Sequence, residues 1–222
     1  MFWSKLLMRA PFLVVRVLFE VLRIELCLVI WLVHFSSATP RNDVGNRHAS
    51  FRGSWCLIWN ILGLCMNSTG KKTALVTGAA GGIGKAIVTA LQASGITVAG
   101  VDLRDCEADH ALIGDLKDPS FCDTLPEIAA DLMGQLDILV NNAGIITRGK
   151  ITEASDQDFA TSMAINVEAP FRLCRAAIPI MAQAGGGAIV NVSSCWGVHP
   201  GPSHPIYVMS KAALASLTQC LG

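Results

Sequence analysis

The chain has 222 residues, of which 52% are hydrophobic and only 15% are charged, an apolar composition for a soluble protein. Its formal net charge is zero, so it lacks the strongly basic balance that is typical of nucleic-acid-binding proteins. The charges are nevertheless unevenly divided between two parts. Residues 1–70 carry seven Lys and Arg against three Asp and Glu, a net +4, whereas residues 71–222 carry ten against fourteen, a net −4. These parts have the composition of two different kinds of polypeptide.

Residues 12–33 are almost all apolar, but Arg16, Glu20, Arg23 and Glu25 interrupt them. The charged residues Arg16, Glu20 and Arg23 fall at the i, i+4, i+7 spacing of one helical stripe. A membrane helix over residues 11–33 is one interpretation, although insertion of each charge near its centre costs about 2.5–3.5 kcal/mol. A signal peptide with a short apolar core is a second interpretation.

A third interpretation places residues 1–65 outside the folded domain, as an apolar and irregular extension or a non-native leader. Residues 40–60 show no hydrophobic period, and Met66 lies only a few residues before the first clear strand. We favour this interpretation and therefore expect the domain to span residues 66–222. We expect a cytoplasmic location, with attachment to a membrane through residues 11–33 as the alternative.

Residues 73–76 form a short strand without charges, and residues 85–91 have helical spacing that ends before Gly95. A glycine-rich turn joins the two, as in dinucleotide-binding folds. Gly78 permits the sharp turn, Gly82 lets a pyrophosphate approach the backbone, and Gly84 lets the helix pack against the strand. The free N–H groups of the helix start then face the phosphates. The residues expected to contact the cofactor here are Gly78, Gly82, Ile83 and Gly84.

The next strand, residues 97–101, ends at Asp102, eighteen residues after Gly84. A carboxylate at this place accepts hydrogen bonds from the adenosine ribose and repels a 2′-phosphate. The sequence therefore favours NAD over NADP, although Arg104 lies close by and keeps NADP as the less favoured alternative.

The rest of this half continues the alternation of strands and helices. Residues 111–114 should form a third strand, and Asp115 and Leu116 follow it where an adenine ring would be contacted. Residues 119–132 read as a helix and residues 137–140 as a buried fourth strand. This alternation predicts an α/β fold with a doubly wound parallel sheet, the Rossmann arrangement.

Three further motifs follow in order. The fourth strand ends in Asn141-Asn142-Ala143-Gly144, and Ser194 precedes Tyr207 by thirteen residues, with Lys211 four residues beyond. With three residues between Gly78 and Gly82, residues 71–222 resemble the short-chain dehydrogenase/reductase family, most closely its 3-oxoacyl-carrier-protein reductases and related alcohol dehydrogenases. The resemblance implies nucleotide contacts for Asn142, Ala143, Gly144, Tyr207 and Lys211. It also implies a catalytic set made of Asn166, Ser194, Tyr207 and Lys211.

The chemistry of Tyr207 and Lys211 can also be argued from their spacing. Residues four apart share one face of a helix. A free phenol has a pKa of about 10, and a neighbouring ammonium group lowers it. Tyr207 could then exchange a proton with a small alcohol or ketone substrate while a hydride passes to or from the nicotinamide. Ser194 would hold the substrate oxygen, and Asn166 would position a water that passes protons from Lys211 to solvent.

The eight cysteines form no C-x-x-C pair and no zinc-like spacing with histidine, so we expect reduced thiols and no metal site. Cys195 directly follows Ser194 and could line the active site. His199 and His204 also lie between Ser194 and Tyr207, and we expect them to be loop residues.

The sequence ends eleven residues after Lys211. The family continues with two more strands and a substrate-covering lid, so we expect an incomplete Rossmann fold whose fifth strand is an exposed edge. Three functions remain open: an NAD(P)-dependent oxidoreductase, an inactive truncated fragment, and a membrane-tethered Rossmann scaffold. The helices at residues 157–182 and 204–221 form subunit contacts in relatives, which implies a homo-oligomer for a complete chain.

Overall fold

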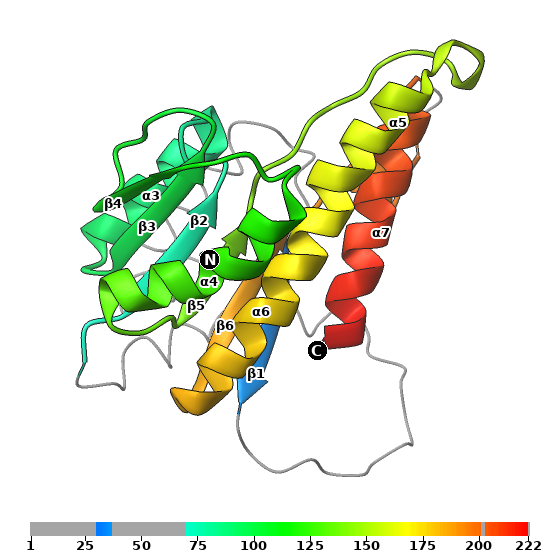
Figure 1. Cartoon of the computed structure of the whole chain (residues 1–222). Coiled ribbons are helices and arrows are strands. Elements are labelled where there is room, and N and C mark those ends of the chain that lie inside the picture. Colours follow the sequence, from blue (N-terminus) through cyan, green and yellow to red (C-terminus); the bar gives the residue numbers. More distant parts are fainter. Residues whose placement is uncertain (1–29, 37–69, 201–202, 222) are drawn as a thin grey trace, which may run out of the picture.

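Six strands form one sheet in the part of the chain that the computed structural model describes, residues 30–36, 70–200 and 203–221 (Figure 1). Their order across the sheet is β1-β6-β5-β2-β3-β4. The five strands from β2 onward are parallel to their neighbours, and only β1 runs antiparallel. The strands are β1 (Ile30–Ser36), β2 (Thr73–Thr77), β3 (Thr97–Asp102), β4 (His110–Ile113), β5 (Ile138–Asn141) and β6 (Gly186–Val192).

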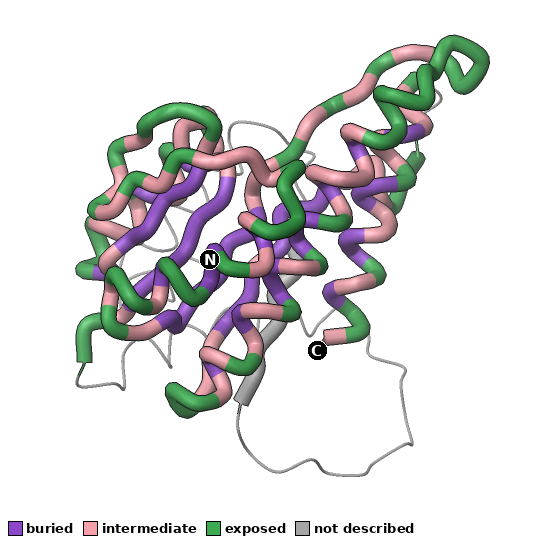
Figure 2. The backbone as a smooth tube through the Cα atoms, in the orientation of Figure 1, coloured by how far each residue is buried: buried purple, intermediate pink, exposed green. Residues whose placement is uncertain are grey.

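The centre of the sheet is buried on both faces, which explains why its strands are apolar without alternation (Figure 2). Leu75 of β2 faces one hydrophobic cluster, which includes Leu125 of α4 and Leu173 of α6. Val76, the next residue, faces a second cluster with Val88 of α3. Helices therefore cover both faces of the sheet, as the doubly wound α/β fold predicted from the sequence requires.

The helices agree with the sequence prediction to within a few residues. Asp118 caps α4 by accepting a hydrogen bond from the N–H of Ser120, and Gly134 ends this helix in the left-handed conformation. The helix after β5 is continuous but contains a π-helical segment, η2, between α5 and α6. The helical elements are α3 (Gly82–Ala93), α4 (Pro119–Met133), η1 (Ile151–Glu153), α5 (Asp156–Met163), η2 (Ala164–Glu168), α6 (Ala169–Gln183), η3 (Cys195–Gly197) and α7 (Pro205–Leu221).

The edge of the sheet beside β6 differs from the expectation. We expected residues 1–65 to supply no strand and β6 to be an unpaired edge, and both expectations are wrong for the described residues. Strand β1 pairs along all of β6, from Ile30 opposite Val192 to Ser36 opposite Gly186. An unpaired edge leaves N–H and C=O groups free, and the sequence IWLVHFS is rich in β-branched and aromatic residues that favour a strand.

Strand β1 also bears on the proposed membrane helix over residues 11–33. The last four residues of that range lie in β1, and the remainder lies outside the described residues. Within the described part of the chain, no helix combines the length and the apolar character needed to cross a bilayer. The interpretation of residues 11–33 as one helix is therefore wrong at its C-terminal end.

Candidate active site

The glycine-rich turn after β2 is held in a shape that side chains would prevent. Gly78 has a φ of +67°, in the left-handed region that favours glycine. A Cβ atom on Gly84 would lie 1.9 Å from the carbonyl oxygen of Gly78, so α3 approaches the turn as closely as its backbone allows. Gly82, in contrast, is exposed, and a Cβ there would meet no atom within 4 Å. Gly82, the first residue of α3, therefore borders space that no protein atom fills, and the next residue, Ile83, is half buried.

Asp102 at the end of β3 lies directly against this turn. One of its carboxylate oxygens accepts a hydrogen bond from the N–H of Ala80 at 3.0 Å, and the other accepts one from the N–H of Leu103 at 2.8 Å. A carboxylate offers about four acceptor positions, so both oxygens keep capacity for a ligand. The guanidinium of Arg104 donates to the carbonyl oxygen of Ala80 at 3.5 Å.

Asp115 and Leu116 follow the carboxyl end of β4, which lies beside the carboxyl end of β3. Asp115 accepts a hydrogen bond from the N–H of Lys117 and forms an ion pair with its Nζ at 3.2 Å. Leu116 is half buried and packs against the hydrophobic cluster under the sheet. Their expected contact with an adenine ring stays a prediction.

Asn142, after β5, joins this strand to the glycine turn. Its side-chain nitrogen donates to the carbonyl oxygens of Thr77 at 2.9 Å and Gly78 at 3.3 Å. The Oγ1 atom of Thr77 in turn accepts from the N–H groups of Asn142 and Ala143, each at 3.0 Å. Thr77 is a site residue that the sequence reasoning missed. Its hydroxyl and its place between a strand and the first glycine of the turn were the only signals available.

Asn166 is fully buried and lies within the π-helical segment η2, a type of distortion that is frequent at functional sites. Its Oδ1 accepts from the N–H of Ile145, and its Nδ2 donates to the carbonyl oxygen of Ile145, both at 2.9 Å. Nδ2 also donates to Oγ of Ser210 at 2.9 Å. Both amide hydrogens are thus in use. A water held by this side chain would have to bond to the remaining acceptor capacity of Oδ1.

Tyr207 and Lys211 lie on one side of α7, as their spacing predicted. The Nζ atom of Lys211 is 5.9 Å from the centre of the Tyr207 ring. Lys211 is only 4% exposed, and its Nζ donates to the carbonyl oxygen of Val192 at the end of β6. Burial lowers the pKa of Lys211 from 10.5 to about 8. Lys211 is therefore a cation at neutral pH, but one that loses its proton far more readily than an ordinary lysine.

Ser194 follows β6 and is 7% exposed. Its Oγ accepts a hydrogen bond from the N–H of Trp196 at 3.2 Å, and this bond caps η3. The neighbouring Ser193 points the other way and donates to the carbonyl oxygen of Lys211 at 2.9 Å. The two adjacent serines thus make different contacts. Ser193 joins the end of β6 to α7, whereas Ser194 caps the short helix η3.

An aromatic group borders Tyr207. The ring of Trp196 is 4.3 Å from that of His204 and meets the ring of Tyr207 edge-on at 6.2 Å. His204 lies in the loop before α7, as expected, and its ring makes a tilted contact with Trp196 beside the candidate site. The sequence prediction singled out Cys195 as a lining residue and gave Trp196 no role.

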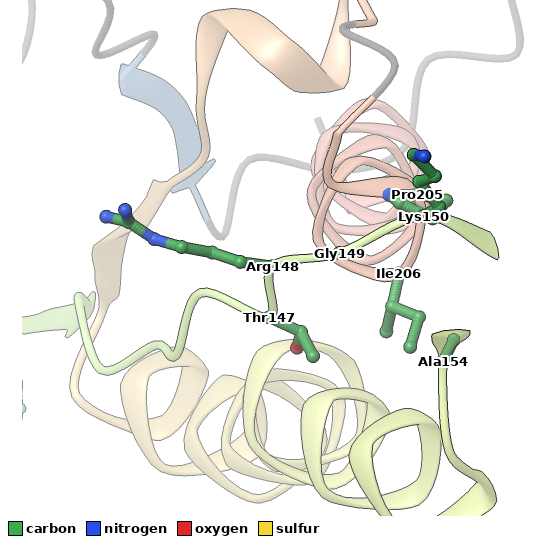
Figure 3. A pocket seen from close by; sticks show the side chains of 7 residues that line it. All are labelled: Thr147, Arg148, Gly149, Lys150, Ala154, Pro205 and Ile206. Carbon is green, nitrogen blue, oxygen red and sulfur yellow. The ribbon is translucent and has the colours of Figure 1, made fainter. Parts of the chain in front are cut away.

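A small pocket lies beside the start of α7, where the loop after β5 approaches this helix (Figure 3). The N–H of Gly149 donates to the carbonyl oxygen of Ser203 at 3.0 Å and joins the loop to the segment before Tyr207. The side chain of Arg148 extends away from Pro205 and Ile206, on the opposite side of the loop (Figure 3). The pocket is lined by Thr147, Arg148, Gly149, Lys150, Ala154, Pro205 and Ile206.

The cysteines of the described part are not joined in disulfides. Burial raises the pKa of Cys122 to about 11 and that of Cys174 to about 12, so neither forms a thiolate at neutral pH. Residues 30–36, 70–200 and 203–221 also contain no group of three or more His, Cys, Asp or Glu side chains arranged to hold a metal ion.

The site thus combines a glycine turn at a strand–helix junction with the buried residues Asn166, Ser194 and Lys211 and the half-buried Tyr207. The family model for short chain dehydrogenases matches residues 72–222. The chain belongs to the short-chain dehydrogenase family.

Two curated relatives and one solved structure illustrate this similarity. An uncharacterized oxidoreductase of Thermotoga maritima is 38% identical over 70% of this chain and 66% of its own length. The D-threitol dehydrogenase of Mycolicibacterium smegmatis is 36% identical over 68% of this chain and 63% of its own length. The structure of a short-chain dehydrogenase from Streptomyces avermitilis aligns with a TM-score of 0.63 and 31% identity, over 69% of this chain and 60% of that one. The chain therefore spans somewhat less than two thirds of the proteins it matches.

Proposed function

We propose that the chain is an oxidoreductase that transfers a hydride between NAD and a secondary alcohol or ketone, with Tyr207 as the general acid and base. The observation that carries the proposal is the placement of the buried Lys211 cation 5.9 Å from the Tyr207 ring. A cation at this distance favours the phenolate form of a tyrosine. The D-threitol dehydrogenase among the relatives supports a small alcohol as the class of substrate.

The residues of the glycine turn fit a dinucleotide. Gly82 leaves open space at the start of α3, where backbone N–H groups suit a pyrophosphate. Asp102 lies against the turn with free acceptor capacity, as a ribose-binding carboxylate must. Its charge opposes a 2′-phosphate, so we propose NAD as the cofactor and NADP as the less favoured alternative. When bound, the nicotinamide ring supplies the acceptor or donor of the hydride.

The protein side chains then handle the proton and the substrate oxygen. Tyr207 takes the hydroxyl proton of an alcohol through its phenolic oxygen, or returns it to a developing alkoxide. Ser194 lies at the end of β6 and would donate a hydrogen bond to the substrate oxygen. Lys211 stabilises the phenolate. The Oδ1 of Asn166 would accept a hydrogen bond from a water that connects Lys211 with solvent.

The second function expected from the sequence is an inactive chain that binds nucleotide weakly and does not turn over, and the assay below distinguishes it from the oxidoreductase. The membrane-tethered scaffold would depend on residues 11–29, which lie outside the described residues.

For the larger assembly, we propose homo-oligomer contacts through residues 157–182 and 204–221, where the large apolar side chains of Phe159, Phe171 and Met209 are exposed.

An absorbance assay of NADH formation with a panel of small secondary alcohols tests the proposal. We expect turnover by the wild-type chain and a loss of about 10²–10⁴-fold in kcat for Tyr207→Phe, because the phenol oxygen is the proton carrier. The melting temperature and the Kd for NADH should stay close to the wild-type values. NADH binding without turnover by the wild type would favour the inactive alternative. Turnover that survives Tyr207→Phe would refute the assigned role.

A further inference from the structure

Ser210 connects the two helices that carry the proposed catalytic side chains. It lies in α7 between Tyr207 and Lys211 and is completely buried. Its hydroxyl donates to the main-chain carbonyl oxygen of Tyr207 at 2.8 Å. Oγ of Ser210 itself accepts a hydrogen bond from Nδ2 of Asn166 at 2.9 Å. A single hydroxyl therefore joins α7 to the π-helical segment η2.

We propose that Ser210 is a positioning residue for the hydride-transfer reaction and acts through the side-chain amide of Asn166. The inference rests on the function proposed above and extends it to a residue outside the set of Asn166, Ser194, Tyr207 and Lys211. A serine has only one hydrogen to donate, and the carbonyl group of Tyr207 receives it. Toward Asn166 the hydroxyl can therefore only accept. Together with Ile145, whose N–H donates to Oδ1, it favours the orientation in which Nδ2, rather than Oδ1, points to α7.

The orientation of the Asn166 amide matters because the side facing away from Ser210 lies close to Gly144 and Lys211. A Cβ atom on Gly144 would be 3.3 Å from Oδ1 of Asn166 and 3.2 Å from Nζ of Lys211. The amide oxygen and the lysine nitrogen thus border the same narrow space next to Gly144. An oxygen there can accept a hydrogen bond from a water shared with a cation. An amide turned by 180° would present N–H groups instead, which cannot do so.

A second hydroxyl in the same helix provides a matched control. Thr218 is also buried, and its Oγ1 donates to the carbonyl oxygen of Leu214 at 2.8 Å. It accepts from Nδ2 of Asn191 at 2.9 Å, as Ser210 does from Asn166. Both hydroxyls therefore form the same type of bridge between an asparagine amide and a helix carbonyl group. Only the bridge through Ser210 includes a residue of the proposed catalytic set.

The experiment removes each hydroxyl in the full chain and measures kcat, KM for NAD⁺ and melting temperature. Ser210→Ala and Thr218→Val each delete one buried hydroxyl with little change in volume. We expect both to lower the melting temperature by a similar amount, about 2–4 °C for each kcal/mol lost. Ser210→Ala should in addition lower kcat roughly tenfold with an unchanged KM, whereas Thr218→Val should leave kcat within about twofold of the wild type.

A double-mutant comparison shows whether Ser210 acts through Asn166. In an Asn166→Ala background, Ser210→Ala should cause no further fall in kcat. Ser210→Cys, whose thiol is a weak donor and acceptor, should give a value between those of the wild type and Ser210→Ala, and it serves if Ser210→Ala does not fold. Equal kcat values for Ser210→Ala and Thr218→Val, or additive losses with Asn166→Ala, would overturn the inference while leaving the proposed function intact. A wild-type chain without turnover would instead remove the proposed function, and the inference with it.

Discussion

The proposed nucleotide site around the glycine turn, here the nucleotide end, and the proposed catalytic site around Tyr207, here the catalytic end, are built by opposite means. The shape of the glycine turn depends on side chains that are absent, since Gly78 and Gly84 lie against other backbone atoms. The proposed role of Tyr207 depends on side chains that are present and buried, namely Asn166, Ser210 and Lys211. Changes at the first end should therefore act through steric conflict and the stability of the fold. Changes at the second should act through hydrogen bonds and charge.

The sharpest test of the nucleotide end compares two glycines of the same turn. Gly84→Ala places a Cβ atom 1.9 Å from the carbonyl oxygen of Gly78, so α3 must shift. We expect the free energy of unfolding to fall by about 1–3 kcal/mol, since overpacking that shifts the backbone costs this much. Denaturant unfolding monitored by circular dichroism measures the change.

Gly82→Ala is the matched control, because a Cβ there meets no atom within 4 Å. Its stability should remain within about 0.5 kcal/mol of the wild type or improve, as alanine favours a helix more than glycine does. Its Kd for NADH should nevertheless increase, because the added methyl group occupies the space expected for the pyrophosphate. Equal destabilisation by the two substitutions would contradict the steric account.

At the catalytic end, the buried charge of Lys211 predicts a dependence of stability on pH. Its pKa is about 8 in the folded protein and 10.5 as a free side chain, so between these values the unfolded state binds more protons. The contribution of Lys211 to stability therefore rises from pH 8 to pH 10.5, by roughly 2–3 kcal/mol, and is constant below this window. Lys211→Met should remove this rise.

Unfolding curves measured in steps from pH 7 to pH 10.5 provide the comparison. Lys117→Met is the control, because Lys117 is exposed and pairs only with Asp115 at the surface. It should show the same pH dependence as the wild type. A wild-type profile that stays parallel to that of Lys211→Met would mean that Lys211 is not held in a desolvated environment.

The smallest of these effects concerns the choice of cofactor. Asp102→Asn keeps a hydrogen-bond acceptor beside Ala80 and removes only the negative charge. We expect the ratio of the NADPH and NADH dissociation constants to fall about tenfold, because the repulsion of a 2′-phosphate is lost. Asp105→Asn is the control, since this carboxylate is exposed and caps only its own loop through the N–H of Cys106. Titration calorimetry with both dinucleotides measures the ratio, and an unchanged value for Asp102→Asn would argue against its role at the ribose.

The local patterns of the sequence predicted much of this structure. The parallel strands, the glycine turn and the shared face of Tyr207 and Lys211 all depend on spacing within short segments, and they lie where expected. Strand β1 was not predicted, because its partner β6 lies more than a hundred residues away and an apolar run alone does not distinguish a strand from a helix. The contacts of Asn166 depend on a π-helical segment, which no local sequence pattern predicts.

The lowered pKa of Lys211 could not be predicted from the sequence for a related reason. The lysine was recognised from its spacing to Tyr207, but its burial results from the packing of α7 against the end of β6. Desolvation of this kind is a property of tertiary structure. The same holds for Thr77 and Ser210, whose roles depend on groups that are distant along the chain or belong to another helix.

The central claim is that Tyr207 exchanges a proton with a substrate held beside a nicotinamide ring. A crystal structure of the chain with NAD⁺ and a slowly reacting secondary alcohol tests it most directly. The account predicts that the alcohol oxygen lies about 3 Å from both the phenolic oxygen of Tyr207 and the Oγ of Ser194, with its carbon facing the nicotinamide ring. A complex in which the nicotinamide ring lies far from Tyr207, or in which the alcohol contacts neither hydroxyl, would contradict it.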